Sequence, residues 1–291
     1  MNTYEIDAVI VTYNPDKKLL FENISAVQNQ VNKVVIVDNG SDNFKSWENE
    51  FNSTNIVLKH LNKNMGIAYA QNFGIKYAKH ENVSWVLTLD QDTVLPKSYV
   101  EELLETGLSD DIGILSGRFV DRSFKMKENF IDDIEKVKDI ISSGNLVNIR
   151  AWQKVGGFDN QLFIDYVDFD FNYKLQRAGY NIYRVNNVTY DHEIGEGVSE
   201  SRYKTFIGLK NKYIFDHSYI RLYYINRNRI IVRSRYPEFG SPYKMIIREI
   251  INLREIFLFK PSRLKKFIFS IKGIGEGICY LLTRRFNHGI N

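Results

Sequence analysis

The first 120 residues alternate between short apolar runs and longer amphipathic stretches. The runs are rich in Val and Ile and have the length of buried strands, whereas the stretches space their apolar residues as helices do. The expected strands are residues 6–13, 33–41, 56–61, 85–90 and 112–117, and the expected helices are residues 16–30 and 66–79. Nearly continuous apolar strands separated by helices predict an α/β fold with a mostly parallel sheet that helices cover on both faces.

The pattern changes in the second half of the chain. Charge rises and the periodicity weakens between residues 119 and 139, which is typical of a variable loop region. A strand with a turn, a helix and a further strand are expected after it, at residues 142–158, 166–178 and 181–192. From about residue 200 the chain is helical and basic to its end.

The composition is that of an ordinary globular protein, with 44% hydrophobic and 25% charged residues. The single cysteine, Cys279, excludes an internal disulfide framework and favours a reducing compartment. The chain has no run of about 18 uncharged apolar residues, so no membrane span is expected. Its N-terminus lacks the basic stretch of a signal peptide, and we expect a cytoplasmic protein. The net charge of +4 is too small to indicate nucleic-acid binding.

Polar residues follow three of the expected strands. In an open parallel sheet, the ligand site lies beyond the carboxyl ends of the strands, so these residues are expected to form one rim. The sequence contains neither GxGxxG nor GxxxxGK[ST], and a nucleotide would have to be held in another way. The rim residues are Thr12, Tyr13, Asn14, Asp38, Asn39, Gly40, Ser41, Asp90, Gln91 and Asp92.

The acidic residues of this rim admit two interpretations. Asp90 and Asp92 are two residues apart, so in an extended chain their side chains share a face. Hard divalent cations bind carboxylate and phosphate oxygens, and the pair therefore suits a metal–diphosphate site, although a solvated turn explains the same residues. Asp38 precedes an Asn-Gly turn signal, which suits both a plain turn and a carboxylate aimed at a nucleobase or ribose.

Small residues open the helix expected at 66–79, within the sequence NMGIAYAQNFG that begins at Asn64. Glycine or alanine at positions 66, 68, 70 and 74 lets another backbone approach closely. Taken alone, this spacing favours tight packing of the helix on the sheet over a ligand site.

Four carboxylates lie among aromatic residues in GGFDNQLFIDYVDFDF: Asp159, Asp165, Asp168 and Asp170. Burying a carboxylate without a partner is costly, so this density suggests a functional cluster. On a helix, Asp165 and Asp168 would share one face and could supply a general base. The alternative is that acidic residues are favoured at a helix N-terminus, which explains one or two of the four.

His192 follows the last expected strand, between Asp191 and Glu193 in a loop that contains glycines. A lone histidine is more often structural than a ligand. A neutral imidazole is nevertheless a common metal ligand, and the acidic neighbours favour that interpretation here.

The motifs occur in one order: TYN, VDNGS, NxGxAxAxNxG, LDQD, GGFD…FIDYVDFD and H-x-x-G. This series resembles the inverting family 2 glycosyltransferases with a GT-A fold, over about residues 4–235. The DQD form, FIDYVDFDF, DHEIG and RLYYINRNRIIV are most similar to bacterial rhamnosyltransferases, and galactofuranosyltransferases look similar at these positions.

The resemblance implies a Rossmann-like nucleotide-binding sheet flanked by helices. It implies a catalytic domain at 1–235, with a nucleotide-sugar-binding half at 1–118 and an acceptor-binding half at 140–235, followed by a helical region at 236–291. The implied donor contacts are Thr12, Tyr13, Asn14, Asp38, Asn39, Asn64, Gly66, Asp90 and Gln91. The implied ligands of a divalent cation, Mg²⁺ or Mn²⁺, are Asp92 directly, His192 and Asp90.

On the acceptor side, the resemblance places the base that deprotonates the acceptor hydroxyl at Asp168. Many relatives carry Glu-Asp where this chain has Val167-Asp168, so Asp165 is kept as the competing base or as an acid that binds the acceptor. Trp152 lies where an aromatic residue would face the substrate.

The expected reaction is therefore transfer of L-rhamnose from dTDP-L-rhamnose to a hydroxyl of a glycan or lipid-linked oligosaccharide, with inversion and no covalent enzyme intermediate. One alternative is a galactofuranosyl- or other UDP-sugar transferase, since an aspartate can pair with uracil or thymine. Others are a non-catalytic subunit that binds nucleotide sugars and, from the basic second half, a nucleic-acid-binding protein. The acidic cluster disfavours the last.

The tail at 242–291 is basic and amphipathic. Ile246, Ile250, Leu253 and Phe257 recur at helical spacing, and residues 244–285 contain ten basic but only three acidic side chains. Such a segment is typical of a membrane-surface element, and we expect it at the inner face of the plasma membrane. The alternative is that its helices pack on the catalytic domain or form a homo-oligomer interface.

Overall fold

The computed structural model describes residues 5–51, 53–120, 132–191, 202–206, 208–209, 214–259 and 262–288. The chain forms two compact units. Unit 1 comprises residues 1–163 and 167–193, and unit 2 comprises residues 164–166 and 194–291. The division at 193 differs from the domain boundary expected at 235, which stays a prediction because a compact unit need not coincide with a functional domain.

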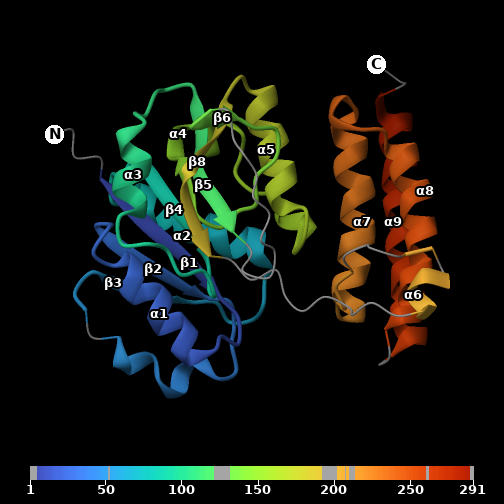
Figure 1. Ribbon diagram of the computed structural model, residues 1–291, viewed down its shortest axis with the longest axis horizontal. Coiled ribbons are helices and arrows are strands. Elements are labelled where there is room, and N and C mark those ends of the chain that lie inside the picture. Colours follow the sequence, from blue (N-terminus) through green and yellow to red (C-terminus); the bar gives the residue numbers. More distant parts are fainter. Residues whose placement is uncertain are drawn as a thin grey trace. The chain divides into compact units, whose positions relative to one another are not determined.

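Unit 1 contains one eight-stranded sheet with the order β3-β2-β1-β4-β7-β5-β8-β6 (Figure 1). Its strands are β1 (Ile6–Thr12), β2 (Lys33–Asp38), β3 (Ile56–His60), β4 (Trp85–Asp90), β5 (Ile112–Val120), β6 (Ile134–Lys136), β7 (Asn145–Asn148) and β8 (Asn181–Asp191). Strands β3, β2, β1 and β4 are parallel to one another, and β5 is parallel to β8. Strand β7 runs antiparallel to its two neighbours, β4 and β5. Strand β6 runs antiparallel to β8. The expected mostly parallel α/β sheet is confirmed.

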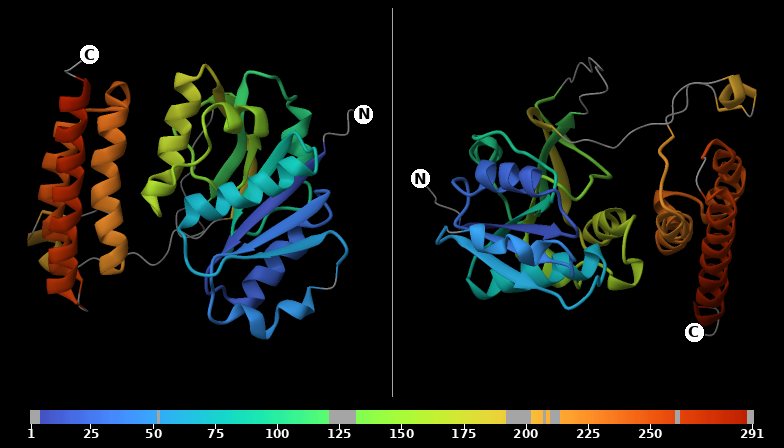
Figure 2. Two further views of the ribbon diagram at one scale, coloured as in Figure 1. Left: turned by 180° about the vertical axis from the view of Figure 1, so that it is seen from behind. Right: turned by 90° about the horizontal axis from the view of Figure 1, so that it is seen from below.

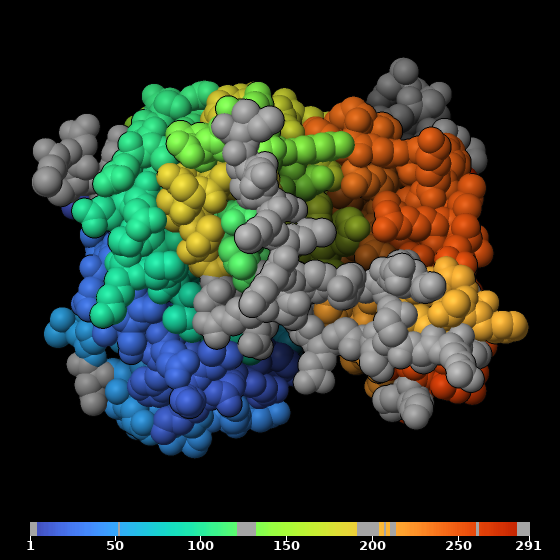
Figure 3. Space-filling view, viewed as in Figure 1, coloured from blue at the N-terminus to red at the C-terminus, as the bar shows by residue number. Residues whose placement is uncertain are grey.

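Helices cover both faces of this sheet. The helices are α1 (Lys17–Val27), α2 (Ile67–His80), α3 (Tyr99–Glu105), α4 (Ile149–Lys154) and α5 (Val167–Arg177). Helices α1 and α3 share a core with the sheet on the face seen in Figure 3, and α2 lies on the opposite face (Figure 2). A Cβ atom on Gly74 of α2 would lie 2.4 Å from Val9 Cγ1, so this glycine permits the close contact of α2 with β1. At position 74 the structure favours the packing interpretation of the small residues.

Several elements differ from the sequence expectation. Strand β6 lies in the expected loop region, and the short helix α3 has no counterpart in the prediction. The turn expected after the strand near 145 is helix α4, which begins because Asn148 accepts hydrogen bonds from the backbone N–H groups of Arg150 and Ala151.

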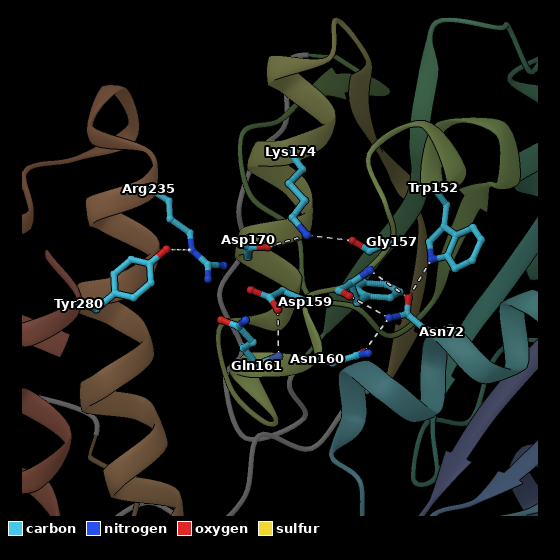
Figure 4. A network of polar contacts seen from close by, with 11 residues as sticks. Asn72, Trp152, Gly157, Asp159, Asn160, Gln161, Asp170, Lys174, Arg235 and Tyr280 are labelled. Atoms are coloured by element: carbon cyan, nitrogen blue, oxygen red, sulfur yellow. Dashed lines mark hydrogen bonds and ion pairs between the residues drawn. The ribbon is translucent and has the colours of Figure 1, made fainter. Parts of the chain in front are cut away.

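Unit 2 is helical. Its helices are α6 (Arg202–Phe206), α7 (Tyr219–Arg235), α8 (Pro242–Asn252) and α9 (Arg263–His288), and α7 packs along α9 (Figures 1 and 2). A Cβ atom on Gly273 of α9 would lie 2.4 Å from the carbonyl oxygen of Tyr223, so glycine allows the two helices to touch. Arg235 on α7 donates to the Tyr280 hydroxyl of α9 at 2.9 Å (Figure 4). No helix in the described ranges is long and apolar enough to cross a membrane.

Asp7 on β1 is a buried acid in the core of unit 1. No described side chain or backbone group makes a hydrogen bond of good geometry to either of its carboxylate oxygens. Burial raises the pKa of Asp7 to about 6, although the charge and the backbone N–H of Lys33 oppose this. The folded protein therefore binds the Asp7 proton more tightly than the unfolded chain does.

We predict that Asp7→Asn stabilises the protein at pH 8 and has little effect at pH 4. The stability that the raised pKa contributes is present below the unfolded value near 4 and is lost as pH rises through about 6. A pKa shift of this size corresponds to a change of at most about 3 kcal/mol in the free energy of unfolding. Urea unfolding at both pH values measures it.

Asp111→Asn is the control of opposite sign, because hydrogen bonds from Ser109 and Asn181 lower the pKa of Asp111. The stability that the lowered pKa of Asp111 contributes is present above the unfolded pKa and is lost as pH falls through the folded value. Asp111→Asn should therefore destabilise the protein at pH 8. If Asp7→Asn changed stability equally at both pH values, the burial argument would be wrong.

Candidate functional site

The carboxyl ends of β1 and β2 hold Asp38 in a fixed orientation. Thr12 and Asp38 are directly paired across the two strands, and both are buried. The Thr12 hydroxyl donates to Asp38 Oδ1 at 3.4 Å, and the backbone N–H of Ser41 lies 3.3 Å from each carboxylate oxygen. The turn that follows β2 therefore orients the Asp38 carboxylate, which agrees with both interpretations of VDNGS.

His60 is a member of this rim that sequence reasoning missed. It pairs with Asp38 across β2 and β3, and its Nδ1 lies 3.6 Å from Asp38 Oδ2. Its Nε2 lies 3.2 Å from Glu48 Oε2, so the imidazole bridges two carboxylates. No motif marks His60, because only the pairing of β3 with β2 brings the three side chains together.

The loop after β1 joins the ends of the neighbouring strands. The backbone N–H of Tyr13 donates to Gln91 Oε1 at 2.8 Å, and that of Asn14 donates to Ser41 Oγ at 2.8 Å. The Asn14 side chain in turn accepts from the backbone N–H of Asp42. Tyr13 is 46% exposed, so its ring is available to a ligand at this edge of the sheet. The structure therefore brings together the rim residues predicted from three separate strands.

Asn39 and Asn64 build the start of α2. Asn39 Nδ2 donates to Asn64 Oδ1 at 3.1 Å, Asn39 Oδ1 accepts from the backbone N–H of Met65, and Asn64 Oδ1 accepts from that of Gly66. Gly66 has φ +87°, and a Cβ atom there would lie 2.6 Å from the carbonyl oxygen of Phe163. Glycine is required at this position by conformation and by space, and a role of these residues in donor binding stays a prediction.

Buried polar groups support the DQD turn after β4. Ser143 Oγ accepts from the backbone N–H of Asp90 at 3.0 Å, and Asn23 donates to the Asp90 carbonyl at 2.7 Å. Tyr190 donates its hydroxyl proton to the Ser143 carbonyl, and burial holds its pKa well above the usual value, with the charges of Tyr99 and Asp90 adding to the effect. Sequence reasoning found none of these supports, which come from α1, β8 and the loop before β7.

The acidic side chains of the turn are accessible. Asp92 is exposed, and Asp90 and Gln91 are half-buried. Among the residues that the structure describes, no three His, Cys, Asp or Glu side chains are grouped so that they could hold a metal ion, and His192 lies outside the described residues. Two carboxylates fit a hard cation that takes its remaining ligands from phosphate oxygens and water.

The four clustered acids have different partners. Asp159 caps a short 3-10 helix (Asn160–Leu162) by accepting from the backbone N–H of Gln161, and buried Asp170 pairs with Lys174 at 3.2 Å (Figure 4). Lys174 also donates to the Gly157 carbonyl at 3.0 Å. Both acids stabilise the fold of unit 1 through these contacts.

Asp165 and Asp168 do not share a helical face, and that expectation is wrong. Helix α5 begins at Val167, and Asp165 precedes it with φ +62°. Half-buried Asp168 lies in the first turn of α5, whereas both carboxylate oxygens of Asp165 accept from the guanidinium of Arg221 in unit 2, at 3.1–3.2 Å. The guanidinium of Arg221 thus binds the Asp165 carboxylate, and a catalytic role of either acid stays a prediction.

Trp152 is 5% exposed, and its indole N–H donates to Asn72 Oδ1 at 3.1 Å (Figure 4). The same Asn72 oxygen accepts from the backbone N–H of Phe158, and its amide nitrogen donates to Asn160 Oδ1 at 2.9 Å. Trp152 therefore helps to hold the turn before α5 in the interior of unit 1, and its contact with substrate stays a prediction.

Comparison with known proteins gives three results. Residues 7–167 match the model of the family described as Glycosyl transferase family 2. The chain is 29% identical to the dTDP-rhamnosyl transferase RfbF of Shigella flexneri over 263 residues. The aligned region covers 84% of this chain and 84% of RfbF. It is 22% identical over 243 residues to the low-salt glycan biosynthesis hexosyltransferase Agl10 of Haloferax volcanii, covering 74% of this chain and 76% of that one.

Among solved structures, the chain is similar to GalNAc-T7 crystallised with UDP, GalNAc and Mn²⁺. The TM-score is 0.61 at 14% sequence identity, and the likeness covers 97% of this chain. The chain spans 58% of the length of that structure, and the likeness supports the fold alone.

Proposed function

Because the chain belongs to glycosyl transferase family 2, we propose that it moves a sugar from a nucleoside diphosphate sugar to a hydroxyl of a glycan acceptor, by a single displacement that inverts the sugar carbon. The family match, the mixed sheet and the solved neighbour confirm the GT-A-type fold. One observation carries the proposal: hydrogen bonds join the ends of β1, β2 and β4 into one rim that presents Asp38 and the DQD turn together.

The proposed donor is dTDP-L-rhamnose. The similarity to a dTDP-rhamnosyl transferase over most of both chains supports it. The Asp38 carboxylate can accept the imide N–H that thymine and uracil share, so this contact does not separate the two bases. A UDP-sugar, such as UDP-galactofuranose, is therefore the second candidate.

We propose that Asp90 and Asp92, together with His192, hold Mg²⁺ or Mn²⁺ next to the diphosphate. A bound cation would neutralise the negative charge that develops on the leaving nucleoside diphosphate. The two carboxylates at the end of β4 supply the hard oxygen ligands that such an ion takes.

Asp168 is the proposed general base. Its carboxylate would take the proton of the acceptor hydroxyl as the new glycosidic bond forms and the bond to the diphosphate breaks. The acceptor oxygen attacks the face opposite the leaving group, so the reaction needs no nucleophilic side chain. Asp165, whose carboxylate is bound by Arg221, is the competing candidate for this role.

Donor binding should raise the melting temperature, because a ligand at about 100 times its Kd stabilises the folded state by about 2.7 kcal/mol. We expect dTDP-rhamnose with Mg²⁺ or Mn²⁺ to give a larger shift than UDP-galactofuranose, UDP-glucose or UDP-N-acetylglucosamine. Asp92→Ala should remove the metal-dependent part of that shift. An unchanged response of Asp92→Ala, measured by calorimetry with the same donor and metal, would contradict the metal assignment.

Asp168→Asn preserves the shape of the side chain but not its basicity. We expect turnover to fall by at least roughly 10²-fold while donor affinity changes little, since the donor rim does not include this residue. Asp165→Asn is the matched comparison and should lose less. If Asp165→Asn were the inactive variant, the base would be Asp165 and the assignment made here would be wrong.

Unit 2 carries two exposed apolar stripes. On α8 the stripe is Tyr243, Ile247, Ile250 and Ile251, and on α9 it is Leu264, Phe267, Ile268 and Ile271, with exposed fractions between 42 and 72%. The helical face predicted for this part of the tail is only partly exposed. On α8, Ile250 is exposed and Ile246 is half-buried, and in the 3-10 helix that follows (Leu253–Leu258), Phe257 is exposed and Leu253 is half-buried. Basic side chains at Lys244, Arg248, Lys265 and Lys272 accompany the stripes.

We propose that these stripes bind the anionic inner face of the plasma membrane, where a lipid-linked acceptor would be presented. Each Lys or Arg near such a surface contributes about 1 kcal/mol, and the apolar side chains enter the headgroup region. Lys266 does not take part, because it is buried and paired with Asp216.

The full-length protein should sediment with vesicles containing phosphatidylglycerol at low salt and be released at high salt. Ile268→Ser with Ile271→Ser should weaken this binding, and Ile134→Ser on β6 of unit 1 is the matched control for loss of an exposed isoleucine. If the protein ignores these vesicles at low salt, the membrane proposal fails. A concentration-dependent dimer in sedimentation velocity would then assign the stripes to a second copy.

A further inference from the structure

The loop that follows β1 is held between two turns of unit 1. Its first residues, Tyr13 and Asn14, which we call the strap, leave the sheet where β1 ends at Thr12. Strand β2 and its turn lie on one side of β1, and β4 with the DQD turn lies on the other. The strap therefore lies between the carboxylate proposed for base recognition and the acids proposed for metal binding.

Two hydrogen bonds anchor the strap on the β2 side. The backbone N–H of Asn14 donates to Ser41 Oγ at 2.8 Å, and Asn14 Oδ1 accepts from the backbone N–H of Asp42 at 2.9 Å. Asn14 has φ +46°, in the left-handed region that asparagine enters more readily than most residues but that still needs support from its surroundings. The two bonds to the turn after β2 provide that support.

The anchor on the β4 side is the side chain of Gln91. Its Oε1 accepts from the backbone N–H of Tyr13 at 2.8 Å, the usual length of such a hydrogen bond. The paired residues of β1 and β4 end at Val11 and Asp90, so this side chain continues the link between the two strands beyond their last pair. The amide oxygen of Gln91 therefore binds the strap, although the neighbours of Gln91 in sequence are the proposed metal ligands.

Tyr13 is the residue that the strap presents to a ligand. Its ring is 46% exposed at the edge of the sheet, and aromatic rings stack on nucleobases. Ordering a mobile loop on binding costs free energy, so a ring whose backbone is already fixed binds a base more tightly. The anchors on the two sides remove that cost because they fix both residues of the strap.

Buried side chains hold the DQD turn independently of the Gln91 side chain. The backbone of Asp90 is bound by Ser143 Oγ at 3.0 Å and by Asn23 at 2.7 Å, and Ser143 Oγ lies 2.7 Å from Thr93 Oγ1 in a further hydrogen bond. These three supporting residues are buried inside unit 1. Loss of the Gln91 amide should therefore leave the turn and its carboxylates in place.

We infer that Gln91 is a positioning residue for recognition of the nucleobase. Its side chain fixes the strap, and with it the ring of Tyr13, so Gln91 acts on the base end of the donor although it lies between the two proposed metal ligands in sequence. The inference rests on the proposed donor site, in which Tyr13 and Asp38 meet the base. It gives the middle residue of the DQD motif a role separate from that of the two acids.

The test compares two ligands that share a diphosphate, dTDP and inorganic pyrophosphate, each with Mn²⁺. The Kd for pyrophosphate divided by the Kd for dTDP, both measured by calorimetry, reports the contribution of the nucleoside. Gln91→Met keeps the length of the side chain but removes the amide acceptor. We expect this ratio to fall by about 3- to 10-fold, the effect of losing one hydrogen bond, and pyrophosphate binding to change by less than about twofold.

Two further variants separate the lost hydrogen bond from a general disturbance of the turn. Gln91→Glu is the conservative variant, because a carboxylate oxygen also accepts the Tyr13 N–H. Its added charge should weaken both ligands alike, so the ratio should return close to the parental value. Ser41→Ala removes the acceptor of the Asn14 N–H but keeps the backbone N–H that donates to Asp38, and it should lower the ratio in the same sense as Gln91→Met.

Gln30→Met is the matched control. Gln30 Oε1 accepts from the backbone N–H of Val100 at 3.0 Å, the same kind of contact outside the rim, so this variant should keep the parental ratio. An unchanged ratio in Gln91→Met, whether or not pyrophosphate binding is lost, would overturn the inference and leave the proposed donor site standing. A parental protein that binds dTDP no more tightly than pyrophosphate would overturn the proposed donor site, and the inference with it.

Discussion

The parallel register of β3, β2, β1 and β4 is the constraint on which the candidate site depends. It pairs Thr12 with Asp38, Asp38 with His60 and Val11 with Asp90, so acids from β2 and β4 flank the end of the central strand β1. A shift of one residue along any of these strands would exchange its two faces and remove its polar end from the rim. The buried Val and Ile faces of the strands hold this register.

Local hydrogen bonds stabilise the two acidic residues at this edge of the sheet, Asp38 through its carboxylate and Asp90 through its backbone. Asp38 accepts from Thr12 and Ser41, and the Asp90 backbone is held by Ser143 and Asn23. Asp7, at the opposite end of β1, is buried, and this burial raises its pKa. Hydrogen bonds thus orient the Asp38 carboxylate and the backbone of Asp90 at the rim, whereas the Asp7 carboxylate is buried in the core.

In unit 2, hydrogen bonds fix the backbone of residues 164–166. Helix α7 binds this segment with one buried amide and two guanidinium groups. Directional hydrogen bonds suit this task because they fix carbonyl positions, which apolar contacts do not.

The sequence by itself determined the α/β class, most of the strands and the rim of Thr12, Asp38 and Asp90, because these follow from hydrophobic runs and from the polar residues that end them. It could not determine that His60 lies beside Asp38, that Trp152 is buried against Asn72, or that Asp165 is occupied by Arg221. These contacts join residues 22, 80 and 56 positions apart, and no local pattern encodes them. Only the tertiary structure decided them, since side chains distant in sequence meet through strand register and helix packing.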